Sequence, residues 1–126
     1  MRAVNIEATD DTPKVVLDKD ANHFEFSGKS LPHNPSKFYY PIIDWIVEYG
    51  ADPNERTEVY FKMDYFNTAS SKMILDIFEK LEAIYKNGHD VEIFWYHDED
   101  DVDMEEAGEE YSEIVDVPLK LKTYDE

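Results

Sequence analysis

Segments with strand-like and helix-like patterns alternate along this chain, and their order restricts the possible folds more than any other feature. Six strand-like runs are predicted, at residues 4–8, 14–17, 23–27, 57–66, 91–96 and 118–123. Three runs with helical spacing separate the last four of them, at residues 38–49, 71–86 and 104–114. Three opening strands followed by regular alternation predict an α/β fold. We expect a single mixed β-sheet with helices packed on it, in the order βββαβαβαβ.

The length and the apolar content predict one globular domain over residues 1–126. A chain of 126 residues can bury one sizeable core, and 42% of its residues are hydrophobic. Disordered chains of high charge are much poorer in apolar side chains. We therefore treat the sequence as one folding unit.

The charge of the chain limits its partners. Thirty acidic residues against twelve basic ones give a net charge of −18. The negative electrostatic field of such a chain repels nucleic acid and anionic membranes, so we expect neither as a partner. Proteins with basic surfaces are the expected partners. The first residues form no apolar signal region, and no apolar run reaches membrane-spanning length. These features predict a soluble cytoplasmic protein.

No pattern in the sequence is typical of a metal site. The chain has no cysteine, and its four histidines lie in different predicted elements, at positions 23, 33, 89 and 97. The acidic run Asp98–Asp103 lacks the glycine that a calcium-binding loop needs at its sixth position, where Asp103 stands. Nine of the thirteen residues from Asp98 to Glu110 are acidic, and we interpret them as a solvated or partner-facing surface.

Catalytic constellations are also missing from the sequence. Only four glycines occur, none of them in a phosphate-binding loop, and there is no nucleophile elbow. No pattern combines a nucleophile with a base and a group that orients the base. We therefore predict a non-enzymatic protein without a cofactor.

The stretch Tyr65–Lys72 joins a predicted strand to a predicted helix. Asn67 is a good N-cap residue, which places Thr68 in the first helical turn. Backbone N–H groups are unpaired there, and the helix dipole favours negative charge, so a threonine at this position is suited to carrying a phosphate. The local sequence leaves an alternative open, in which Asn67, Thr68, Ser70 and Ser71 only cap the helix.

Several uncommon strings, spread over almost the full length, occur together in this chain. They are Ile6-Glu7-Ala8-Thr9 with Thr12-Pro13, Gly28-Lys29-Ser30-Leu31-Pro32-His33-Asn34-Pro35, Pro41-Ile42-Ile43-Asp44-Trp45, Tyr65-Phe66-Asn67-Thr68-Ala69-Ser70-Ser71-Lys72, Trp95-Tyr96 and Asp103-Met104-Glu105-Glu106-Ala107-Gly108-Glu109-Glu110. In this order they resemble the SiaC-type regulatory phosphoproteins of bacteria, a family long known as a domain of unknown function. Ala69 stands where a serine is expected, but the threonine itself is present.

The resemblance implies a fold similar to the anti-sigma-factor antagonist (STAS-like) domain, whose phosphorylated residue also follows a strand at a helix start. It implies that a serine/threonine kinase and a PPM-type phosphatase act on Thr68. It also implies that the unphosphorylated form binds and activates a diguanylate cyclase, which raises cyclic di-GMP and favours aggregation or biofilm growth.

Together these observations predict a signalling switch regulated at Thr68, with no metal site. We expect Lys72 to be the cation that pairs with the phosphate. The predicted partner-binding residues form one run, Asn67, Thr68, Ala69, Ser70, Ser71 and Lys72. The alternative is an acidic protein-binding module, with or without cation binding through Asp98–Glu110, that uses Thr68 only as a cap.

Overall fold

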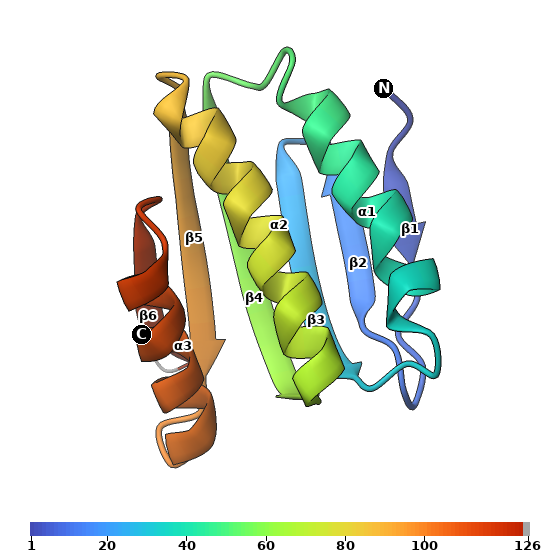
Figure 1. The fold of residues 1–126 in the computed structure, drawn as a ribbon, viewed down its shortest axis with the longest axis vertical. Coiled ribbons are helices and arrows are strands. Elements are labelled where there is room, and N and C mark those ends of the chain that lie inside the picture. The colour runs from blue at the N-terminus through green and yellow to red at the C-terminus, as the bar shows by residue number, and fades with distance from the viewer. Residues whose placement is uncertain (125–126) are drawn as a thin grey trace.

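The computed structural model describes residues 1–124, so residues 125 and 126 of the predicted domain lie outside the described part. Its strands form one six-stranded sheet, and three helices lie together over one face of it (Figure 1). The elements follow the predicted order: β1 (Val4–Ile6), β2 (Lys14–Asp18), β3 (His23–Ser30), α1 (Pro35–Tyr49), β4 (Arg56–Phe66), α2 (Thr68–Lys86), β5 (Asp90–His97), α3 (Val102–Ile114) and β6 (Leu119–Thr123).

The sheet is mixed, as predicted, and its strands lie in sequence order from β1 to β6. The pairs β1–β2 and β2–β3 are antiparallel, whereas β3–β4, β4–β5 and β5–β6 are parallel. Each parallel connection contains one helix, so α1, α2 and α3 all begin near the edge where the parallel strands end (Figure 1). This edge contains the junction between β4 and α2.

The core lies between the sheet and the helices. Alternate residues of β4 point to the helices, and Val59, Phe61 and Met63 are buried there. The predicted apolar stripe of α2 is buried against them, at Ile74, Ile77, Phe78, Leu81 and Ile84. Trp95 of β5 is fully buried. These buried side chains hold α2 against the sheet along its length, and Trp95 also bonds the first turn of α3.

Some element bounds differ from the prediction. Residues 28–30 belong to β3, although their composition is typical of a loop, and the strand pairing shifts between Gly28 and Lys29. Gly28 has a φ of 104°, a left-handed conformation that glycine adopts without strain. Helix α1 begins at Pro35, earlier than its apolar pattern indicates, and Pro41 lies inside the helix.

Candidate functional site

The junction between β4 and α2 has the geometry of a capped helix start. Asn67 adopts an extended conformation, and its side chain accepts a hydrogen bond of 2.9 Å from the backbone N–H of Ser70. Its carbonyl accepts a second bond from the N–H of Ser71. Asn67 is therefore the N-cap and Thr68 is the first helical residue, as predicted.

Thr68 itself is exposed and has no part in this cap. Within residues 1–124 its hydroxyl forms no hydrogen bond, and only its carbonyl is engaged, by the hydroxyl of Ser71 at 2.7 Å. The N–H groups of Thr68 and Ala69 open the helix and have no partner within it. The first turn of α2 contains no acidic residue. An added phosphate would therefore meet free donors and a favourable helix dipole.

A cluster of buried hydroxyls lies beneath this turn and joins three elements. Ser30 at the end of β3 donates to the hydroxyl of Ser70 at 2.8 Å, and Ser70 donates to the carbonyl of Ser30 at 2.9 Å. The hydroxyl of Tyr39 in α1 is hydrogen-bonded to that of Ser30, and burial raises the pKa of Tyr39. These hydrogen bonds fix the start of α2 to β3 and α1. We call Ser30, Tyr39 and Ser70 the hydroxyl cluster.

The six residues predicted to bind partners do not share one surface. Thr68, Ala69 and Lys72 are exposed, and Asn67 and Ser71 are half-buried. Ser70 is fully buried, so the prediction of a direct partner contact through its side chain does not fit this geometry. The reason is the helical period, which turns Ser70 towards the sheet while Thr68 and Lys72 face outward.

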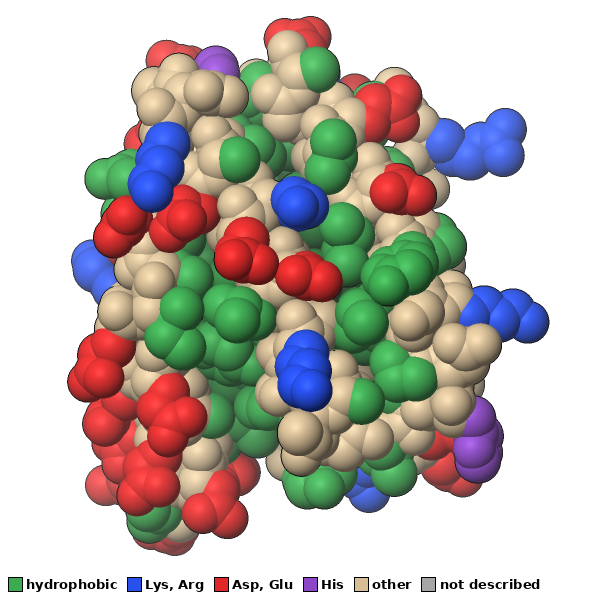
Figure 2. Space-filling view, in the orientation of Figure 1, with side chains coloured by type: hydrophobic (Ala, Val, Ile, Leu, Met, Phe, Trp, Pro, Cys, Tyr) green, Lys and Arg blue, Asp and Glu red, His purple; other side chains and the backbone are tan. Residues whose placement is uncertain are grey.

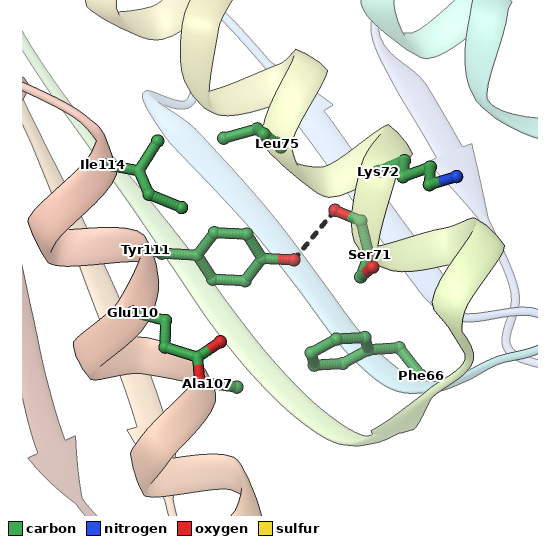
Figure 3. Close-up of a pocket in the computed structure, with 8 residues that line it drawn as sticks. All are labelled: Phe66, Ser71, Lys72, Leu75, Ala107, Glu110, Tyr111 and Ile114. Carbon is green, nitrogen blue, oxygen red and sulfur yellow. Dashed lines mark hydrogen bonds between the residues drawn. The ribbon is translucent and has the colours of Figure 1, made fainter.

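Lys72 follows Thr68 by four residues and therefore lies on the same side of α2. Its ammonium group points away from Tyr111 and into solvent (Figure 3). Among residues 1–124 no carboxylate forms an ion pair with it. This cation is thus available to a phosphate on Thr68 or to a partner.

A groove runs between α2 and α3 beside these residues. Its main hollow encloses about 230 Å³ and is lined by Phe66, Ser71, Lys72, Leu75, Ala107, Glu110, Tyr111 and Ile114 (Figure 3). An adjoining hollow shares Phe66 and Ala107 and adds Tyr65, Asp103 and Met104. Tyr111 crosses the floor and donates to the carbonyl of Ser71 at 2.8 Å. We call these two hollows together the α2–α3 groove.

Helix α3 lies close to the sheet because Gly108 faces Trp95. A Cβ at Gly108 would lie 2.5 Å from the Cδ1 atom of Trp95. The indole of Trp95 is held in place by a hydrogen bond of 2.9 Å to the carbonyl of Met104. This close approach sets the depth of the α2–α3 groove.

The acidic segment forms the start and the outer face of α3. Asp101 is the N-cap and accepts from the N–H of Met104 at 3.0 Å, which gives one carboxylate of the run a local structural role. Many of the remaining carboxylates lie on the outer side of α3, next to the hydrophobic side chains between α2 and α3 (Figure 2). No group of three histidine, aspartate or glutamate side chains within residues 1–124 could hold a metal ion.

The histidines occupy separate places in the described structure. His23 lies 3.4 Å from Glu25, and His33 lies 3.9 Å from Asp11. His97 is buried and its Nδ1 atom contacts the carbonyl of Asp98. No helix within residues 1–124 combines the length and the apolar character that a membrane crossing requires.

Sequence reasoning missed the hydroxyl cluster and the groove. Ser30 and Ser70 are forty residues apart, and only the parallel pairing of β3 with β4 brings them together. Two serines near the carboxyl ends of neighbouring parallel strands were the available signal. The groove depends on the spacing of two helices, which no local pattern encodes.

Comparison with known proteins agrees with this geometry. Residues 6–124 match the model of the SiaC family regulatory phosphoproteins. An uncharacterized protein of Pseudomonas aeruginosa (strain UCBPP-PA14) is 29% identical over the full length of both chains. The resemblance predicted from the strings is thereby confirmed.

Solved structures share the fold over nearly the whole chain. The crystal structure of apo-SiaC from Pseudomonas aeruginosa is 30% identical, with a TM-score of 0.90 over 97% of this chain and 99% of that one. A matching chain occurs in the crystal structure of the diguanylate cyclase SiaD in complex with its activator SiaC, also from Pseudomonas aeruginosa. It is 28% identical, with a TM-score of 0.90 over 96% of this chain and 99% of that one.

Proposed function

Because the chain belongs to the SiaC family of regulatory phosphoproteins, we propose that it is a non-enzymatic switch controlled by phosphorylation of Thr68. In this proposal a serine/threonine kinase adds the phosphate and a PPM-type phosphatase removes it. The unphosphorylated form binds and activates a diguanylate cyclase, and so raises cyclic di-GMP and promotes aggregation or biofilm growth. The protein acts in the cytoplasm, where kinases and cyclases find their nucleotides.

One observation carries the proposal: the hydroxyl of Thr68 is exposed at a helix start and free of hydrogen bonds within residues 1–124. Asn67 performs the capping, so the alternative in which Thr68 is only a cap lacks support from the side-chain geometry. A cyclase partner is supported by the similar chain seen in complex with the cyclase SiaD.

The physical effect of the phosphate also fits a surface switch. It adds about −1.5 to −2 charge and three strong acceptors. Because the N–H groups of Thr68 and Ala69 are open and Lys72 is nearby, the helix start tolerates this charge. Phosphorylation therefore changes what the surface binds and leaves the fold intact.

The test compares wild type, Thr68→Ala and Thr68→Asp with enzymatically phosphorylated protein. Intact-mass analysis of protein from native cells should give one phosphate increment, which Thr68→Ala abolishes. Ser71→Ala is the matched control, since it removes the neighbouring hydroxyl and should still be phosphorylated. Thr68→Ala should keep cyclase binding, whereas phosphorylation should weaken it about tenfold or more, a change of at least ~1.4 kcal/mol.

Thr68→Asp should weaken binding less than phosphate does, because it carries one charge on a flat carboxylate. Equal cyclase affinity for the wild-type, Thr68→Asp and phosphorylated proteins would rule out a switch at Thr68. Loss of binding together with melting of the domain would instead contradict the surface mechanism.

A further inference from the structure

The α2–α3 groove is lined mainly by apolar side chains, several of which are only partly covered by the rest of the chain. Phe66, Leu75 and Ala107 are half-buried, Tyr111 on the floor is buried, and Ile114 at the end is 62% exposed. In Figure 2 hydrophobic side chains, drawn in green, form a strip between α2 and α3. An apolar strip with polar borders is typical of a protein-binding surface.

The two walls of the groove carry opposite charges. On the α3 side, Asp103 and Glu110 line the hollows, and α3 contains no basic residue. On the α2 side the lining residue with a charge is Lys72. A segment that fits both walls needs basic side chains along one edge and a carboxylate along the other.

Thr68 lies in line with the α2 wall. Residues three, four and seven positions later share its side of the helix, and these are Ser71, Lys72 and Leu75, all of which line the groove. A phosphate on Thr68 would therefore stand at the mouth of the groove, one turn from Lys72.

We infer that the α2–α3 groove is the docking surface for the effector, an inference that rests on the proposed function. The occupant is an amphipathic segment of the diguanylate cyclase. Its apolar ridge fills the strip, its lysine or arginine side chains face Asp103 and Glu110, and a carboxylate pairs with Lys72. Phosphate on Thr68 takes Lys72 as its own partner and repels that carboxylate, so only the unphosphorylated form accepts the segment.

A second hollow in the helix layer supplies matched controls. It lies between the ends of α1 and α2 and is lined by Val47, Gly50, Ala51, Lys80, Ala83, Ile84 and Asn87. Val47 is 54% exposed, close to the value for Ile114, and Lys80 is exposed like Lys72. Equivalent substitutions can therefore be made at both hollows without disturbing buried residues.

The experiment measures binding of the full-length diguanylate cyclase from the same organism to unphosphorylated protein by calorimetry. Ile114→Glu and Lys72→Glu should each lower the affinity about tenfold or more, whereas Val47→Glu and Lys80→Glu should change it less than about threefold. Glu110→Lys should also weaken binding, with Glu48→Lys on the exposed side of α1 as its control. Thermal melts should be unchanged for all six variants.

The outcomes separate this inference from the proposed function. If Ile114→Glu, Lys72→Glu and Glu110→Lys all bound the cyclase as tightly as wild type, the groove would not be the docking surface. The cyclase would still be the effector. A cyclase that does not bind even the unphosphorylated wild type would overturn the effector assignment and the groove with it. In phosphorylated protein, Lys72→Glu should cause no further loss of cyclase affinity. Both changes remove the same contact, between Lys72 and the carboxylate of the partner.

Discussion

On the inner side of the first turn of α2, Ser70 is fully buried and hydrogen-bonded to Ser30, whereas on the outer side Thr68 is exposed and its hydroxyl is unpaired within residues 1–124. These two hydroxyls are only two positions apart. The hydroxyl of Ser70 stabilises the position of the helix, and the hydroxyl of Thr68 is accessible to a modifying enzyme. The contrast shows how one turn of helix can be fixed in place and still offer a modifiable group.

The same contrast extends to α3. Its inner side presses Gly108 against the buried Trp95, and its outer side carries solvated carboxylates. We therefore expect inner substitutions to change the free energy of unfolding and outer substitutions to leave it almost unchanged.

The largest expected effect is at Gly108. Glycine to alanine in a helix normally adds about 1 kcal/mol of stability, but here the new Cβ would collide with Trp95. Gly108→Ala should instead destabilise the protein by roughly 1–3 kcal/mol, as overpacked cores do. Urea denaturation measures the change, with Ser112→Ala on the exposed side of α3 as control. A stabilised Gly108→Ala protein would show that α3 moves freely relative to the sheet.

A smaller loss is expected when the hydroxyl cluster is broken. Ser70→Ala removes the bond to the carbonyl of Ser30 and leaves buried polar groups with fewer partners. The free energy of unfolding should fall by about 1–2 kcal/mol. The control is Ser71→Ala, whose hydroxyl bonds the carbonyl of Thr68 near the surface and should matter by less than about 0.5 kcal/mol. Equal losses of unfolding free energy in Ser70→Ala and Ser71→Ala would contradict the proposed difference between the inner and outer sides of this turn.

The smallest effect, and the one of opposite sign, concerns Thr68. A carboxylate in the first helical turn interacts favourably with the helix dipole, so Thr68→Asp should stabilise the fold by roughly 0.3–1 kcal/mol at low salt. Thr68→Ala should stay within about 0.5 kcal/mol of wild type. Denaturation curves at low and high salt should show the gain shrinking as the charge is screened. A destabilised Thr68→Asp protein would mean that the outer side also supports the fold.

Much of the architecture could be predicted because it is encoded locally. The alternating side chains of β4 follow from the two-residue period of a strand, and the apolar stripe of α2 follows from the 3.6-residue period of a helix. The cap at Asn67 follows from residue type alone. The extension of β3 through Gly28 could not be predicted in this way, because the pairing with β4 overrides a loop-like composition.

The candidate site was predictable at its centre but not around it. Thr68 could be placed at a helix start from a few neighbouring residues. The burial of Ser70 needed the position of Ser30, and the groove needed the distance of α3 from the sheet, which Gly108 and Trp95 set together. Such features depend on long-range packing, and a single sequence carries no direct signal for it.

The freedom of the Thr68 hydroxyl from structural hydrogen bonds also has a consequence for the life of the protein in a cell. Proteases remove a chain in proportion to how often it unfolds. If Thr68 is phosphorylated as proposed, the phosphate replaces no internal contact and gains from the helix dipole, so the phosphorylated form would unfold no more often than the unphosphorylated one and would not be degraded faster. The signal would then reside in the ratio of two long-lived forms, and it could be reversed by a phosphatase without new protein synthesis.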